Sequence, residues 1–146
     1  MEKPKVLYHG SSKKLIGEKL VPKKPTDLEN KKENLYEGIY ATDIKDLAIT
    51  MAIICSKGVI SSGLNFQKNN PEGIIYNGWP EQEKVFIYTL PSKSFKQTGK
   101  IKHQFVSKTP VKPLKLERVS IKDYPDLFRK ATKKEKEEWI KKYGEL

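Results

Sequence analysis

Few side chains of this 146-residue chain could do chemistry, and most of them stand beside predicted strands. His9 and His103 are the only histidines, Cys55 is the only cysteine, and no HxxxH or CxxC spacing occurs. Because a structural zinc site usually takes four Cys or His ligands in closely spaced pairs, we expect no metal. The P-loop and GxGxxG motifs are also absent, so neither nucleoside triphosphate hydrolysis nor hydride transfer is favoured.

Cys55 is the one candidate for a cysteine nucleophile. It falls on the apolar stripe of a predicted helix, where a buried and unreactive thiol is the more common arrangement. A single cysteine also excludes an internal disulfide.

Polar residues gather instead where three predicted strands begin or end. His9-Gly10-Ser11 follows the apolar run 6–8, and Tyr40 stands near the end of the run 35–41 in Gly38-Ile39-Tyr40. Gln104 opens the run 104–107. Taken singly, each residue is more typical of core or surface than of a site.

In this order the segments resemble the ADP-ribosyltransferase superfamily, on its diphtheria-toxin and poly(ADP-ribose) polymerase side. That family has His-Gly-Ser/Thr after its first strand, then Gly-Ile/Leu-Tyr before a helix, then Glu before an aromatic–aliphatic strand. The resemblance covers residues 6–12, 37–58 and 84–107.

The resemblance implies that NAD is the substrate. His9 would bond a ribose hydroxyl, with Ser11 as a supporting donor. The backbone of Gly10 would hold the nicotinamide carboxamide, since a residue without Cβ lets the chain approach a flat ring. Tyr40 would pack against nicotinamide. The implied reaction breaks the nicotinamide glycosidic bond and transfers ADP-ribose to a protein or nucleic-acid acceptor, as in toxins and effectors.

Residue 104 departs from the family pattern. The family places there a carboxylate that stabilises the positive charge developing on the ribose, whereas this chain has Gln104. An amide bonds a hydroxyl but supplies no charge, which typically costs about 10²–10³ in rate. We count His9, Tyr40 and Gln104 as the catalytic candidates. Slow transfer, use of another acid, binding without catalysis, and an inactivating replacement of a glutamate by Gln104 all stay open.

Two positions in the predicted helix also differ from polymerases. Met51 replaces a second stacking tyrosine and Ala48 replaces a carboxamide-binding serine. Met51 can still cover a ring face, so it remains a candidate NAD contact. We expect transfer of single ADP-ribose units rather than chain elongation.

The charge is strongly positive, with 29 Lys+Arg against 18 Asp+Glu and a formal charge of +11. Residues 93–118 hold eight basic side chains against one acid, a net +7. Lysine dominates, which favours attraction to phosphates with little base readout. The lysines expected to meet an acidic acceptor, nucleic acid or protein, are Lys93, Lys96, Lys100, Lys102 and Lys108.

Two other functions compete with ADP-ribosyl transfer to an acceptor. One is a catalytically inactive protein of the same fold that binds nucleic acid or an acidic partner through residues 93–118. The other is the RNA 2′-phosphotransferase branch, which also begins with His-Gly. That branch relies on arginines for phosphates and carries an additional N-terminal domain. Arg118 and Arg129 are the only arginines here, so the chain fits it poorly.

The elements that must position these residues follow from periodicity and turn residues. A mostly apolar helix is predicted from about 44 to 55, capped by Thr42 or Asp43 and ended by Gly58. A second helix starts at the capping box Thr132–Glu135, ends before Gly144 and docks through Trp139, Ile140 and Tyr143. Further strands are expected at 73–76, 85–90 and 114–121, with mostly loop at 13–34 and 59–83.

These elements indicate one α+β domain over residues 1–146, with mainly antiparallel sheets, one buried early helix and a C-terminal helix. The resemblance adds the split sheets of ADP-ribosyltransferases. No apolar run approaches the roughly 18 residues of a membrane helix, and the first residues lack a signal-peptide core. We therefore expect a cytoplasmic protein without membrane contact.

Overall fold

The structure is a computed structural model that describes residues 4–15, 17–22, 38–65, 72–97 and 102–145. Several predictions concern residues outside these ranges: the loop at 23–34, the start of the second strand at 35–37, the loop at 66–71, and Lys100. The described residues form an α+β fold with small, mostly antiparallel sheets and two α-helices, which confirms the predicted class.

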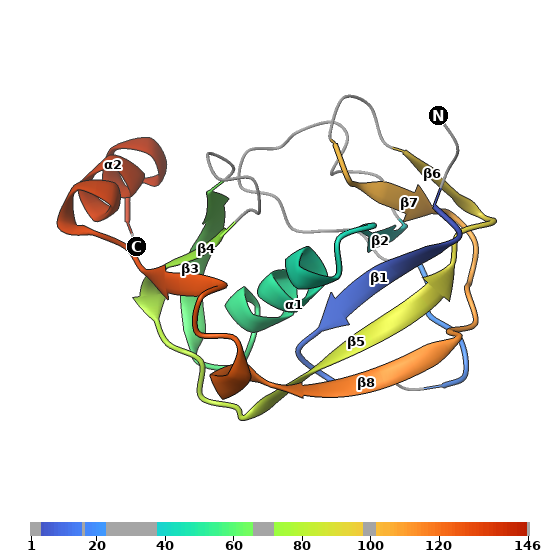
Figure 1. Cartoon of the computed structure of the whole chain (residues 1–146). Helices are drawn as coiled ribbons and strands as arrows, with labels where there is room; N and C mark the ends of the chain where they lie inside the picture. Colours follow the sequence, from blue (N-terminus) through green and yellow to red (C-terminus); the bar gives the residue numbers. More distant parts are fainter. Residues whose placement is uncertain (1–3, 16, 23–37, 66–71, 98–101, 146) are drawn as a thin grey trace.

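Three three-stranded sheets make up the described strands (Figure 1). Their orders are β1-β5-β8, β2-β7-β6 and β3-β4-β9. All neighbouring strands pair antiparallel except β4 and β9. The bounds are β1 Val6–Ser11, β2 Ile39–Ala41, β3 Val59–Asn65, β4 Glu72–Gly78, β5 Lys84–Pro91, β6 Phe95–Gln97, β7 Phe105–Ser107, β8 Lys115–Ser120 and β9 Phe128–Lys130.

The sheet β1-β5-β8 contains the strand that the sequence indicates most clearly. β5 covers the predicted run 85–90, and β8 falls within the predicted run 114–121. β1 is longer than expected, because His9, Gly10 and Ser11 continue the strand instead of forming a turn after it. Their pairing with β5, from Val6 opposite Pro91 to Ser11 opposite Phe86, keeps them extended.

Helix α1, Lys45–Ile54, packs between the sheets β1-β5-β8 and β3-β4-β9 (Figure 1). Its predicted burial is confirmed, since Ala48, Ile49 and Ile53 are almost inaccessible. The predicted cap is displaced: Ile44 is the N-cap and has no side-chain cap bond, while the Thr42 hydroxyl accepts from the Ile44 N–H at 3.1 Å.

The prediction that residues 59–83 are mostly loop is wrong for 59–65. These residues form β3, which pairs with β4. The expected strand 73–76 is confirmed as part of β4. Ser61, Ser62 and Gly63 weaken the strand pattern in the sequence, and the β3–β4 register shifts around Ser61. The strand exists because β4 supplies backbone partners along its length.

Helix α2, Lys133–Tyr143, begins at the predicted capping box and ends at Gly144, whose φ is 89°. Its docking face is only partly as predicted. Trp139 stacks on Tyr76 of β4 with ring centroids 4.2 Å apart, and Tyr143 lies 4.4 Å from Trp139. Ile140, however, is 43% exposed, so it lies outside the contact that Trp139 makes with the sheet.

The core has two parts on the two sides of the sheet β1-β5-β8. Leu7, Leu90 and Phe105 belong to the part shared with the sheet β2-β7-β6. Ile53 and Ile87 belong to the part shared with α1. Among the described residues, no helix is both long and apolar enough to span a bilayer.

Candidate active site

The histidine of the first motif is bonded to the strand that carries the second motif. Tyr8 of β1 and Thr42 exchange two backbone bonds, of 2.7 and 2.9 Å, which join β1 to the end of β2. One residue further along β1, the His9 Nδ1–H donates to the Tyr40 carbonyl oxygen at 2.6 Å. In the neutral ring this bond leaves Nε2 as an acceptor, the form that a ribose hydroxyl requires.

Gly10 lies where β1 and β2 separate. Successive residues of a strand direct their backbone groups to opposite edges, so the N–H and C=O of Gly10 face the same edge as those of Tyr8. Tyr8 meets Thr42 there, whereas no backbone pairing of Gly10 with β2 is found among the described residues. This edge offers an adjacent donor and acceptor, which is what a carboxamide can pair with.

Gly10 also has a structural role that the sequence interpretation missed. A Cβ at this position would overlap the backbone carbonyl of Ala48 and lie 3.0 Å from the Ala52 Cβ. The glycine therefore allows α1 to pack directly on β1. Ala48, which stands where polymerases carry a serine, therefore lies directly beneath Gly10 and is only 2% exposed.

Tyr40 and Gln104 share one face of the β2–β7 pair. β2 pairs with β7 so that Tyr40 is opposite Val106 and Ala41 is opposite Phe105. Continued by one residue, the register places Gln104 opposite Thr42, on the face that Tyr40 also occupies. Both Tyr40 and Gln104 are half-buried, whereas Ala41 and Phe105 face the core.

His103 anchors the backbone just before Gln104. Its Nδ1 lies 2.8 Å from the Asp43 Oδ1, three residues after Tyr40. His103 is the only non-glycine with positive φ among the described residues, at 61°. This conformation is uncommon for a side-chain-bearing residue, so the pair with Asp43 helps to hold the entry to β7. The sequence alone does not predict this ion pair. The only hint in the sequence is that Asp43 and His103 stand close to the motif residues Tyr40 and Gln104.

Ser11 and Met51 have surroundings that the sequence does not predict, and their role toward NAD stays a prediction. The Ser11 hydroxyl donates to the Lys13 carbonyl at 2.7 Å and accepts from the Lys13 N–H at 3.2 Å, so a local turn already uses it. Met51 is 41% exposed on α1 instead of lying in its buried stripe. The buried side of the helix is set by contact with both neighbouring sheets, which leaves Met51 outside.

Cys55 is not buried as predicted but exposed at the C-cap of α1. The atoms packed around its sulfur nevertheless desolvate the thiol and raise its pKa. A raised pKa reduces the thiolate fraction at neutral pH, so this environment does not activate the cysteine.

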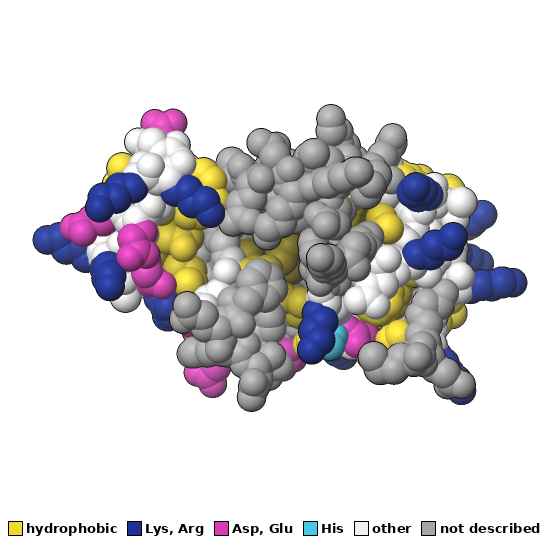
Figure 2. All heavy atoms as spheres, turned by 90° about the horizontal axis from the view of Figure 1, so that it is seen from above, with side chains coloured by type: hydrophobic (Ala, Val, Ile, Leu, Met, Phe, Trp, Pro, Cys, Tyr) yellow, Lys and Arg dark blue, Asp and Glu magenta, His cyan; other side chains and the backbone are white. Residues whose placement is uncertain are grey.

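The basic stretch is a solvent-facing surface. Lys and Arg side chains gather at both ends of the molecule, the end that carries α2 and the end that carries β6 and β7 (Figure 2). The four predicted partner-binding lysines within the described residues are all exposed: Lys93, Lys96, Lys102 and Lys108. One of these lysines, Lys102, directly precedes His103, which pairs with Asp43.

Comparisons of the chain with models of known protein families, with curated proteins and with solved structures found no match.

Proposed function

We propose that this chain is an NAD-dependent mono-ADP-ribosyltransferase with the split-sheet fold of that superfamily. The observation that carries the proposal is the bond from His9 to the Tyr40 carbonyl. It joins the first two motifs at the edge where the Gly10 backbone faces outward, so three residues with family roles meet in one place.

The proposed reaction uses these groups in a defined order. The backbone of Gly10 pairs with the nicotinamide carboxamide, and Tyr40 packs against the ring. The His9 Nε2 accepts a bond from a ribose hydroxyl. The bond between ribose C1′ and the nicotinamide nitrogen breaks, with its electron pair leaving on nicotinamide. A nucleophile of the acceptor then bonds to C1′ and releases its proton to solvent.

Gln104 limits the rate of this reaction. The ribose gains positive charge as nicotinamide leaves, and a neutral amide stabilises that charge less than a carboxylate does. We therefore propose slow transfer by the natural chain, to an acceptor that meets the exposed lysines beside the site. We assign the activity to the cytoplasm, as the sequence predicts.

The decisive experiment converts the amide to the family's carboxylate. The Gln104→Glu protein, incubated with NAD, should release nicotinamide about 10²–10³ times faster than the natural chain. Gln97→Glu is the control for added charge alone, because exposed Gln97 pairs with Phe105 and gains the same charge on the strand next to Gln104; its nicotinamide release should stay slow. If Gln104→Glu releases no nicotinamide and NAD shifts the melting temperature of neither protein, the enzyme proposal is wrong.

The exposed lysines favour a second candidate, a binding protein without catalysis. In that case the surface of Lys93, Lys96, Lys102 and Lys108 would bind nucleic acid through its phosphates. Affinity for a single-stranded or duplex oligonucleotide should then fall steeply with salt, and charge reversal at these four lysines should abolish it. Weak binding with no salt dependence would contradict this function.

A further inference from the structure

The strand β8 has a backbone edge that no described residue pairs with. On its other side it pairs with β5, from Lys115 opposite Thr89 to Ser120 opposite Lys84. The Ile121 N–H donates to the Glu83 carbonyl at 2.9 Å, which shows that odd-numbered residues direct their backbone groups toward β5. Leu116 and Arg118 therefore direct theirs to the outer edge of the sheet (Figure 1).

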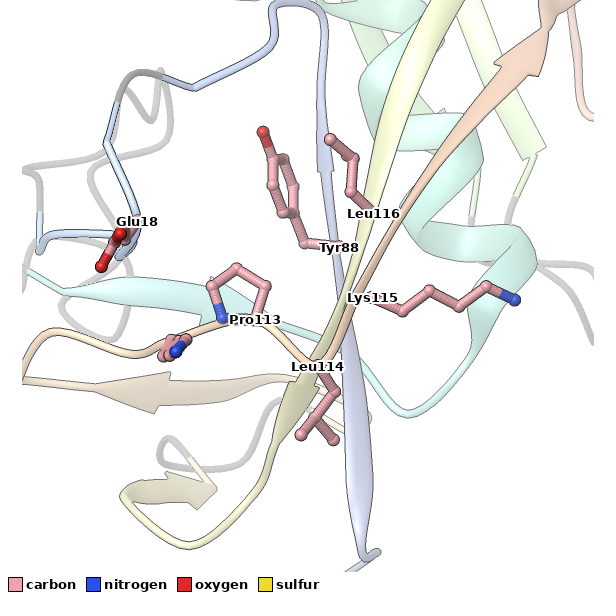
Figure 3. A pocket seen from close by; sticks show the side chains of 7 residues that line it. Glu18, Tyr88, Pro113, Leu114, Lys115 and Leu116 are labelled. Atoms are coloured by element: carbon pink, nitrogen blue, oxygen red, sulfur yellow. The ribbon is translucent and has the colours of Figure 1, made fainter.

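Apolar surface adjoins this edge. A shallow groove of about 350 Å³ is lined by Tyr88, Pro113 and Leu116, with Glu18 on its opposite rim (Figure 3). Leu114, at the start of the same segment, is 63% exposed and Leu116 is 36% exposed. β8 carries charges, as natural edge strands usually do, yet it also exposes Leu116 beside the groove, and apolar surface on a strand edge favours contact with another molecule.

The charge around the groove is positive. Lys112 and Lys115 line it, and Arg118 is exposed further along the strand, against the single acid Glu18. Glu117 offsets Lys115, which it meets at 3.5 Å, and both of its carboxylate oxygens also accept from Lys45 at 3.0 Å. Lys112 and Arg118 have no acid partner among the described residues. An occupant of this surface gains from negative charge.

We propose that the β8 edge binds an extended acidic peptide segment of a protein partner by strand addition. The peptide backbone would pair with the outward N–H and C=O groups of Leu116 and Arg118. One of its apolar side chains would enter the groove beside Tyr88, and its carboxylates would lie near Lys112 and Arg118. A peptide fits better than nucleic acid, because backbone pairing and an apolar groove are features that peptides use.

The test uses the whole chain and fluorescein-labelled peptides of about seven residues, with one central Val, Glu two residues to either side of it and Thr elsewhere, because residues two apart share one face of a strand. The acidic peptide should bind with measurable anisotropy change, and its counterpart with Lys in place of Glu should not. Leu116→Pro removes one outward N–H without breaking the pairing to β5, so it should weaken binding about tenfold more than Leu116→Ala does. Lys112→Glu with Arg118→Glu should weaken it by a similar factor, and Lys93→Glu with Lys96→Glu should not.

Three results would overturn the proposal. The first is acidic-peptide affinity weaker than about 1 mM. The second is equal binding by the Leu116→Pro and Leu116→Ala proteins when circular dichroism shows both folded. The third is displacement of the peptide by a single-stranded oligonucleotide whose binding depends on Lys112 and Arg118, which would identify the occupant as nucleic acid. Failure of the NAD experiment does not affect these outcomes, because the pairing groups of β8 lie on the far side of β5 from β1 and contact neither NAD-binding motif.

Discussion

The Nδ1 of His9 lies 2.6 Å from the backbone carbonyl oxygen of Tyr40, 31 residues later in the chain. This bond orients the imidazole and assigns its protonated nitrogen, because a carbonyl can only accept. It also ties β1 to β2 just beyond the Tyr8–Thr42 bridge, where the two strands separate. In the neutral ring, one nitrogen therefore donates to a structural partner, and the other can itself accept a hydrogen bond.

Substitutions of His9 can separate these two roles. The His9→Asn amide can still donate to the Tyr40 carbonyl but has no group at the position of Nε2, whereas His9→Ala loses both. We expect both changes to abolish the NAD-induced rise in melting temperature. Only His9→Ala should lower the free energy of unfolding, by about 1 kcal/mol. A histidine with a purely structural role would leave the NAD response of the folded His9→Asn protein unchanged.

Gly10→Ala should destabilise the fold, because the added methyl would overlap the Ala48 carbonyl on α1. Overpacking of this kind costs about 1–3 kcal/mol. Gly63→Ala is the matched control, since a Cβ there would make ordinary contacts of 3.6 and 3.8 Å with Tyr76 and Trp139. Urea unfolding of both proteins measures the difference. Equal stabilities would show that α1 does not need the glycine to approach β1.

The ion pair of Glu135 makes stability depend on pH. Arg129 donates to both Glu135 oxygens, at 2.7 and 3.0 Å, and lowers the pKa of this carboxyl from 4.5 to about 2. A lowered pKa means that the stabilisation is present above pH 4.5 and is lost as the pH falls toward 2.

Glu135→Gln tests this pH dependence, because glutamine can still complete the capping box with Thr132. Between pH 5 and pH 2 the melting temperature of the Glu135→Gln protein should fall by fewer degrees than that of the unsubstituted protein, each measured from its own value at pH 5. Parallel falls in the two proteins would show that the Arg129–Glu135 pair does not contribute.

Docking of α2 should depend on Trp139 and not on Ile140. The Trp139–Tyr76 pair joins α2 to β4 and contributes about 0.5–1.5 kcal/mol beyond the apolar area that Trp139 buries, whereas the Trp139–Tyr143 pair lies within the helix. Trp139→Ala should therefore speed amide exchange in α2 by roughly tenfold or more. Ile140→Ala, at an exposed position of the same helix, should change it little. Equal effects would mean that the ring stack does not hold the helix.

The sequence by itself determined the elements whose signal is local. The apolar run 85–90 predicts β5, and the Thr132–Glu135 capping box with Gly144 marks both ends of α2, since capping depends on residues a few positions apart. The apolar composition of 44–55 predicts a buried helix. The motif residues His9, Tyr40 and Gln104 can also be selected from the sequence, as strand-end groups in a resembling order.

Only the tertiary structure decided what depends on distant partners. β3 forms because β4 pairs with it, despite its serines and glycine. Met51 and Cys55 are exposed because two sheets, and not the helix's own periodicity, choose the buried side of α1. The packing role of Gly10 against Ala48 and the His103–Asp43 pair across 60 residues likewise require chain segments that the sequence does not place side by side. Long-range packing, which has no local signal, made each of these choices.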